Sequence, residues 1–585
     1  MIRSLSRRFL SCLIAASMLL ATVLPAAAQR PVAPKLLPPE TLAIIRVADT
    51  PKLIERFRET SIGKIGQDEN IKPLVSNLYG SLKQAWGQIE EQVGLPLDQV
   101  LGIPQGEICV ALVGVPEQRP GVVAFLDAKD RMFQLKKLLA RGETLLQDNG
   151  GSKVTEEIER QDVAVYTGRG NQQFYLIERD GTIAIATTRE LAKSVLIAWN
   201  GGAEKSLADN DKYNRVMSRC AGAVDEPPQV TWFVDPIDAV KAFARGTAAA
   251  TGLALIPVLG LDGLKGVGGS MTFSTGEFDD VTHLHVLLDN PRAGVIETIA
   301  MKSGDSTPET WVPSDAASYT TLHWDVQQTF KVTAKLYNSL MYDGALQDEI
   351  RRRASDRIGI DIEKDLLPIL NGRVTMVQWV ERPVRVNSMT TIVGVKITEP
   401  KALDPILDKV RSRYGENLER QRFGAVSYWS IKMPQREGQT NVRQPSPCFG
   451  VIGDYVVFSD STAAFREAVL TASDVSRGLA NSLDYKLIAS KIKRQPGGDA
   501  PGMVQFNRPE ESLRYLYDIA TADASKQFLA SRSEDNPLFG TLDKALKDNP
   551  LPPFAVLAQY LAPGGGMMVN DETGVHYSTF TLKRK

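Results

Sequence analysis

The sequence predicts an α+β protein of two homologous halves, each a mainly antiparallel, hairpin-rich sheet with helices packed on one face. Three observations predict this fold: sequence blocks that recur in one order, apolar strands joined by tight turns, and helix-start signals after those strands. The length of 585 residues also favours more than one domain.

The internal repeat consists of seven blocks, and their order is the same in both halves of the chain. The clearest pair is QFYLIERDGTIAIATTRELAKSVLIA and CFGVIGDYVVFSDSTAAFREAVLTA. One such resemblance is common by chance, whereas a shared order of seven indicates duplication. The pairs begin at Leu37 and Val312, Val93 and Ile358, Val123 and Val393, Gln173 and Cys448, Leu207 and Leu479, Gln229 and Met503, and Gly268 and Gly564.

The blocks set the predicted domain boundaries. Residues 41–290 form the first α+β repeat and residues 312–585 the second. Residues 291–311 are polar and rich in turn formers, which is typical of a linker. Residues 29–40, QRPVAPKLLPPE, form a proline-rich leader that we expect to be extended.

Local signals predict the elements within each repeat. Asp180-Gly181 separates two apolar runs and predicts a hairpin. Thr187 and Glu190 have the spacing of a capping box at the start of a helix. Asp235-Pro236 predicts a strand that ends and a helix that begins, with aspartate as N-cap. The glycine-rich stretch 260–270 is expected to be a flexible turn before a strand.

The N-terminus has the pattern of a signal peptide, residues 1–28. A basic start with Arg7-Arg8 precedes the apolar run Phe9–Leu24, and Ala26–Ala28 offers a cleavage site before Gln29. We therefore expect export to the periplasm or the extracellular space, by the general or the twin-arginine route. No later apolar segment is long and uninterrupted enough to span a membrane, so no transmembrane segment is predicted in the mature chain.

Composition excludes some classes of protein. There are 68 basic and 69 acidic residues, so the chain lacks the basic bias of a nucleic-acid-binding protein. After removal of the signal peptide, Cys109, Cys220 and Cys448 remain, too few for a disulfide scaffold. Whether Cys109 and Cys220 pair is left open.

Catalytic and cofactor motifs are not found in the sequence. It has four histidines and no G-x-S-x-G, H-E-x-x-H or C-x-x-C pattern. Residues 209–211 resemble the start of a calcium loop without its glycine or final glutamate. The pairs Asp361 with Glu363 and Asp279 with Asp280 fit a helix start and a hairpin turn. We predict no catalytic, cofactor-binding or metal-binding residues.

Two of the four histidines lie in the predicted strand VTHLHVLL, residues 281–288. Alternation predicts that Thr282, Leu284, Val286 and Leu288 pack on the sheet and that His283 and His285 point the other way. Aligning the second repeat on this strand places His576 on the opposite face, so no third metal ligand is identifiable.

Three stretches carry a resemblance to a known family: LLPPETLAIIRVADTPKLIERFRETSIGKI, VGLPLDQVLGIPQGEICVAL, and the strand–strand–helix unit ending in LADNDKYNRVMS. They resemble a bacterial family of domains of unknown function, whose members are exported, internally duplicated envelope proteins. The resemblance covers nearly the whole mature chain. It implies an α+β fold and an envelope location, and it implies no activity, cofactor or catalytic residue.

The leading hypothesis is an exported, non-catalytic envelope protein that binds, scaffolds or assembles through its duplicated domain. One alternative is a hydrolase with an unrecognised acidic site between the two halves. Another is a carrier of an apolar ligand. The partner is an unknown envelope protein or ligand, and the oligomeric state and the relative orientation of the halves are left open.

Overall fold

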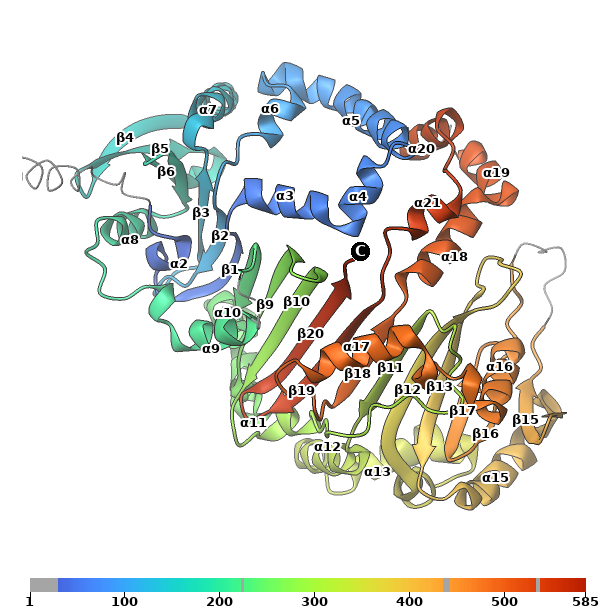
Figure 1. Ribbon diagram of the computed structural model, residues 1–585. Coiled ribbons are helices and arrows are strands. Elements are labelled where there is room, and N and C mark those ends of the chain that lie inside the picture. Colours follow the sequence, from blue (N-terminus) through green and yellow to red (C-terminus); the bar gives the residue numbers. More distant parts are fainter. Residues whose placement is uncertain (1–29, 222–225, 435–441, 533–536, 585) are drawn as a thin grey trace, which may run out of the picture.

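The computed structural model describes residues 30–221, 226–434, 442–532 and 537–584. In this part of the chain, twenty strands form one continuous antiparallel sheet, and helices lie between groups of strands in the sequence (Figure 1). The predicted α+β class is confirmed. No described helix is both long enough and apolar enough to cross a membrane. The predicted signal peptide lies outside the described residues.

Strands β1 to β10 form one part of the sheet, here called the first sheet unit. Their hydrogen-bonded order is β4-β5-β6-β7-β3-β2-β1-β8-β9-β10. The strands are β1 (Thr41–Val47), β2 (Ile108–Val113), β3 (Gly121–Asp127), β4 (Ser152–Ile158), β5 (Gln161–Thr167), β6 (Gln173–Arg179), β7 (Thr182–Ala186), β8 (Val230–Val234), β9 (Leu264–Thr275) and β10 (Phe278–Leu288).

Strands β11 to β20 form the second sheet unit. Their order is β14-β15-β16-β17-β13-β12-β11-β18-β19-β20, which is the order of the first unit with each number raised by ten. The strands are β11 (Ser318–His323), β12 (Leu370–Val380), β13 (Met389–Ile397), β14 (Leu418–Phe423), β15 (Val426–Ile431), β16 (Cys448–Ile452), β17 (Tyr455–Ser459), β18 (Met503–Asn507), β19 (Gly564–Asp571) and β20 (Gly574–Leu582).

The two units meet where β10 pairs antiparallel with β20 (Figure 1). We call this pairing the seam. A second contact lies among the helices, where Ile71 packs with Phe554 and Leu557. The helices at this contact are α4 (Ser61–Gln67), α5 (Lys72–Val93), α18 (Pro509–Thr521) and α21 (Phe554–Ala558). The helices α3 (Thr50–Glu59), α6 (Leu97–Leu101), α19 (Asp523–Arg532) and α20 (Pro537–Asp548) precede or follow them in the chain.

One face of the sheet carries the two largest cores. In the first unit, Phe125 and Ile177 are buried against Leu196 of α8 and Val216 of α9. In the second unit, α16 and α17 cover the corresponding strands. These helices are α8 (Arg189–Trp199), α9 (Asp211–Cys220), α16 (Thr462–Ser473) and α17 (Leu483–Lys493).

The opposite face is covered as well, so the prediction of helices on one face is wrong. Leu135 of α7 packs against Ile183, and Leu403 and Ile406 of the α15 region pack against Ile397. The outer strands carry apolar side chains on both faces of the sheet, so helices must pack on both faces. The remaining helices are α7 (Met132–Asp148), α10 (Pro236–Ala244), α11 (Leu255–Val258), α12 (Val326–Leu340), α13 (Ala345–Ile350), α14 (Asp356–Ile358) and α15 (Asp404–Tyr414).

Two glycines let helices approach the sheet closely. A Cβ added at Gly268 of β9 would meet Val216 of α9, and one at Gly565 of β19 would meet Ile488 of α17. The stretch 260–270 is therefore not a flexible turn, because β9 already begins at Leu264. Its glycines are needed for close packing within the strand.

Local predictions are confirmed in part. β6 and β7 form the predicted hairpin, and both Asp180 and Gly181 have the positive φ of a tight turn. Asp235 caps α10 as predicted, accepting a hydrogen bond from the Asp238 amide. The predicted cap of α8 is wrong by one residue, because Thr188 accepts from the Leu191 amide.

The segments that enter the two sheet units are buried. The leader is not fully extended, since Ala33–Leu36 forms the short helix α2, and Ala33 and Leu36 are fully buried. Trp311, in the segment predicted as a linker, is equally buried in the core of the second unit. Each of these segments packs against its sheet through a tight apolar contact, which places its neighbouring charged residues inside the protein.

Candidate functional site

The seam brings three of the four histidines together. His285 of β10 pairs directly with His576 of β20, and His283 lies two residues further along β10. All three are buried, with His285 completely enclosed. The prediction that His283 and His285 face away from the packed side is wrong, and so is the placement of His576 on the opposite face.

The rings are close enough to interact. His283 Nδ1 and His576 Nε2 are 3.3 Å apart, and the ring centroids are 5.4 Å apart. The His285 and His576 centroids are 5.7 Å apart. Burial lowers the pKa of His283 and of His285 to about 4. Burial and the neighbouring His283 lower the pKa of His576 to about 3. All three imidazoles are therefore neutral at pH 7.

Much of the hydrogen-bonding capacity of this cluster is unused. His283 Nε2, His576 Nδ1 and both nitrogens of His285 have no hydrogen-bond partner. The same holds for Ser578 Oγ and for Arg219 Nε. Buried polar atoms without partners cost free energy, and a concentration of them at one place is a feature of functional sites.

A small pocket opens onto His283 and His576 of the cluster. Its volume is about 110 Å³. Arg219 at its wall is already paired, because its Nη2 lies 2.6 Å from Asp571 Oδ2. Both sheet units contribute to the pocket, and its lining residues are Ser218, Arg219, His283, Gln495, Pro496, Met567, His576 and Ser578. Among the described residues, no three His, Cys, Asp or Glu side chains are already arranged to hold a metal ion.

The carboxylate pairs of the sequence have structural partners. Asp279 and Asp280 lie within β10 and not in a hairpin turn, so that prediction is wrong. Burial raises the pKa of both carboxyls, and Asp279 accepts a hydrogen bond from the Ser61 amide at the start of α4. Asp361 accepts from the backbone amides of Glu363 and Lys364, as expected for a helix start.

The residues resembling a calcium loop also have structural roles. Asp209 accepts hydrogen bonds from the backbone and side chain of Ser206, and Asn210 caps α9.

The cysteines Cys109, Cys220 and Cys448 are buried and free, so Cys109 and Cys220 do not pair. Burial raises the pKa of the Cys109 and Cys220 thiols to about 12. These thiols are therefore protonated and unreactive at neutral pH.

A large apolar pocket lies beneath α7 in the first sheet unit. Its volume is about 710 Å³, and its walls come from α7, the end of α5 and strands β5 to β7. Only two of its lining residues are charged, Arg141 and Glu143. The lining residues are Trp86, Gln92, Val93, Val100, Leu138, Leu139, Arg141, Gly142, Glu143, Leu145, Leu146, Tyr166, Phe174, Leu176 and Ile185.

The matching place in the second sheet unit carries a row of aromatic rings. By strand register, Phe449 of β16 corresponds to Leu176 and Phe458 of β17 to Ile185. Trp429 and Phe449 are stacked with centroids 5.7 Å apart, and Phe449 and Phe458 are 5.9 Å apart. Here the larger rings pack against one another, whereas the first unit has smaller aliphatic side chains.

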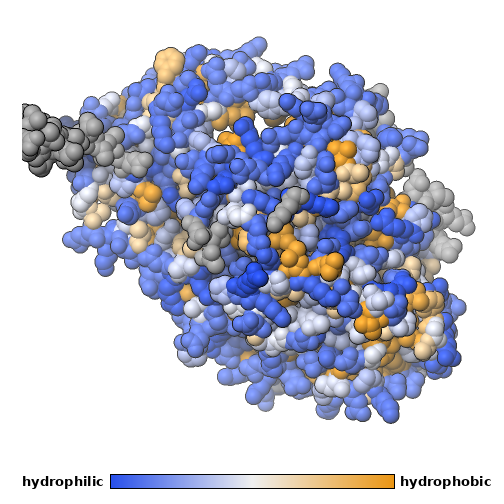
Figure 2. Space-filling model, in the orientation of Figure 1, coloured by the Kyte–Doolittle hydropathy of each residue, from blue (hydrophilic) through white to orange (hydrophobic). Residues whose placement is uncertain are grey.

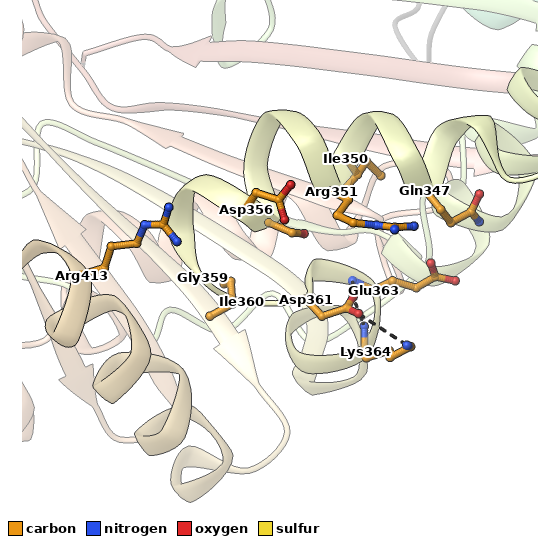
Figure 3. Close-up of a pocket in the computed structure, with 11 residues that line it drawn as sticks. Gln347, Ile350, Arg351, Asp356, Gly359, Ile360, Asp361, Glu363, Lys364 and Arg413 are labelled. Atoms are coloured by element: carbon orange, nitrogen blue, oxygen red, sulfur yellow. Dashed lines mark hydrogen bonds and ion pairs between the residues drawn. The ribbon is translucent and has the colours of Figure 1, made fainter.

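A third pocket, also of about 710 Å³, is strongly polar (Figure 3). It lies in the second unit around residues 347–364, with Arg413 pointing toward it from α15. Lys364 and Asp361 are 3.7 Å apart, and Asp361 is already used as a cap. Its basic and acidic groups are mixed, so the pocket presents no surface of a single charge to a ligand.

The surface seen in Figure 2 is mainly hydrophilic, with hydrophobic residues in separate groups. Two of these groups lie over α16 and α17, which carry the exposed side chains Leu470, Leu483 and Leu487. Dispersed apolar residues of this kind are ordinary on protein surfaces. The open apolar pocket beneath α7, which gathers apolar side chains at one place, is therefore the more distinctive apolar feature.

A scan against protein-family models, a search of curated proteins and a search of solved structures each returned no match. The resemblance to exported envelope proteins of unknown function stays a prediction.

Proposed function

We propose that this chain is an exported, non-catalytic binding protein of the cell envelope, and that its first sheet unit holds an apolar ligand beneath α7. The apolar pocket carries this proposal, because its volume of about 710 Å³ is typical of ligand-binding sites. A long acyl chain is the class of ligand that such walls suit best.

The charged residues at the pocket already have partners, which supports an apolar ligand. Arg141 Nε donates to the Gln92 carbonyl oxygen over 2.7 Å. Glu143 forms an ion pair of 2.8 Å with Lys153. A polar ligand would have to compete with these contacts, whereas an acyl chain gains free energy by leaving water.

The aromatic row in the second unit supports a ligand in the first unit only. Phe449 and Phe458 occupy the places of Leu176 and Ile185, so equivalent space is taken by rings that belong to the protein. On this proposal the two halves descend from one domain, and one copy has kept or gained a cavity.

Strand register supports that common origin. Gly268 pairs with His285 in the first unit, and Gly565 pairs with Phe580 in the second. With this correspondence His283 matches Ser578, and these two residues face each other across the seam. The seam then has a local two-fold axis at this pair, as expected where two copies of one domain associate through the same strand.

Filling the pocket tests the proposal. Gly142 lines it from α7, and a Cβ there meets no atom within 4 Å. We expect Gly142→Trp to weaken binding of a fluorescent fatty acid at least tenfold, because the indole occupies the cavity. Gly80→Trp is the matched control, since Gly80 lies in helix α5 with equally open space and outside the pocket lining.

Equal fatty-acid affinity in wild type and both tryptophan variants would contradict binding beneath α7, and no binding to any of them would contradict an apolar ligand altogether. Mass spectrometry of organic extracts from the purified protein would identify the class of bound ligand.

Export is tested separately by fractionating cells and sequencing the mature N-terminus, where we expect Gln29 first. A protein that retains residue 1 in the cytoplasmic fraction would contradict export.

A further inference from the structure

We infer that His283, His285 and His576 form a binding site for a late first-row divalent metal ion such as Zn²⁺, Ni²⁺ or Cu²⁺. Imidazole nitrogen is a preferred ligand of these ions, and three histidines with an open fourth position are an established zinc-binding set. The inference is independent of the apolar pocket, which lies in the first sheet unit and shares no lining residue with this site.

The distances between the imidazoles fit a shared ion. Two nitrogens bound at 2.0–2.1 Å to a tetrahedral ion are separated by about 3.3–3.4 Å. His283 Nδ1 and His576 Nε2 are separated by 3.3 Å. An ion would replace this hydrogen bond, and the proton that the two nitrogens share would move to the free nitrogen of its own ring, His283 Nε2 or His576 Nδ1.

His285 supplies the third ligand after a side-chain rotation. Its centroid is 5.7 Å from that of His576, close to the 5.4 Å between His283 and His576. Neither nitrogen of His285 has a hydrogen-bond partner. Turning the ring toward the ion gives up only a loose contact with the Thr573 backbone and gives a partner to a buried nitrogen that lacks one.

The surroundings are compatible with a cation. Arg219 in the wall and Arg215 near His285 both repel a cation, and Asp571, which pairs with Arg219, attracts it and offsets part of this repulsion. The three imidazoles are neutral ligands and do not need to lose a proton from a charged form. The fourth coordination position faces the pocket of about 110 Å³, where Ser218, Gln495 and Ser578 can hydrogen-bond a water molecule.

The location gives the ion a structural consequence. His283 and His285 belong to β10 of the first sheet unit, and His576 belongs to β20 of the second. One ion bound by all three would link the units across the seam. Because binding to the folded state alone stabilises it, the melting temperature should rise with metal concentration.

Metal titration of the full mature protein tests the site. After EDTA treatment and desalting, we expect one Cu²⁺ or Ni²⁺ per chain by calorimetry, and several nitrogen ligands in the Cu²⁺ electron paramagnetic resonance spectrum. His576→Ala and His283→Ala should weaken binding at least a hundredfold. His323→Ala is the matched control, because His323 lies outside the cluster and contacts the Asp305 carbonyl oxygen.

Outcomes that overturn the inference are well separated. Absence of stoichiometric binding would do so, as would equal affinity of wild type and the cluster variants. If a cluster variant fails to fold, the wild-type spectrum decides, since a spectrum with no nitrogen ligands excludes the site. Tight phosphate binding in place of metal would identify an anion site and also overturn it. Fatty-acid binding should persist in EDTA, which keeps the two proposals distinguishable.

Discussion

The segments that precede the first strand of each sheet unit form buried ion pairs with the sheet at equivalent places, but with the charges reversed. In the first unit, the leader residue Arg30 pairs with Glu107 and with Asp127, the latter over 3.1 Å. In the second unit, Glu309 lies 2.8 Å from Arg373. The buried partner on the sheet is thus an acid in one unit and a base in the other.

Strand register shows that these partners are equivalent. Ile44 and Tyr319 each pair with a phenylalanine of the neighbouring strand, Phe233 and Phe506. On their other side they pair with Ala111 and Val377, and four residues before these lie Glu107 and Arg373. Each segment therefore matches its own unit, and an exchange of segments would bring like charges together in a buried place. The reversed charges therefore favour the pairing of each segment with its own sheet unit over pairing with the other unit.

Reversing the buried charge in the second unit should have the largest effect. In Arg373→Glu, two carboxylates face each other at positions that are 5% and 7% exposed. We expect a loss of about 5 kcal/mol in the free energy of unfolding, measured by urea denaturation. Adding Glu309→Arg should restore part of it. If the double variant is no more stable than Arg373→Glu, charge matching is not the reason for the pair. The exposed Arg353→Glu serves as control.

Removing the leader arginine should cost less, because Glu107 also pairs with Arg46. We expect Arg30→Ala to lose about 3 kcal/mol in the free energy of unfolding. The guanidinium also lies over the rings of Phe125 and Trp199, so tryptophan fluorescence should change. Arg119→Ala, at an exposed position, is the control. Equal stability of the two variants would show that the leader contributes little.

Adding a methyl group at the two close-approach glycines should affect both units alike. Gly268→Ala and Gly565→Ala each place a Cβ against α9 or α17. We expect each to lose about 2 kcal/mol by overpacking, seen as a lower midpoint of urea denaturation. Gly80→Ala should instead be stabilising, since it adds helix propensity in open space. A loss at only one of the two sites would weaken the equivalence of the units.

Helix caps should give the smallest effect. Thr188 accepts from the Leu191 amide and Ser461 from the Ala464 amide at equivalent helix starts. We expect Thr188→Ala to lower the free energy of unfolding by about 1 kcal/mol. Ser461→Ala should lose more, because Ser461 also donates to Glu381. Thermal melts of the two variants would show this order, and a reversed order would contradict it.

Much of the fold could be predicted where the signal is local. The Asp180-Gly181 hairpin and the Asp235 cap depend on neighbouring residues only, and both are confirmed. The prediction that helices cover only one face of the sheet is wrong, because the alternation of apolar residues does not show which helix packs on which face. The prediction of an extended leader is wrong for a similar reason. Ala33 and Leu36 belong to a buried helix only because they pack on the sheet.

The sequence by itself determined the α+β class and the hairpins, because turn residues and side-chain alternation act within a few residues. It also placed His283 and His285 on one strand. Only the tertiary structure decided what faces them. His283 and His576 are 293 residues apart, and the pairing of β10 with β20 brings their rings together. That pairing depends on the register between two sheet units, and a one-residue slip would move His576 to the other face of the sheet.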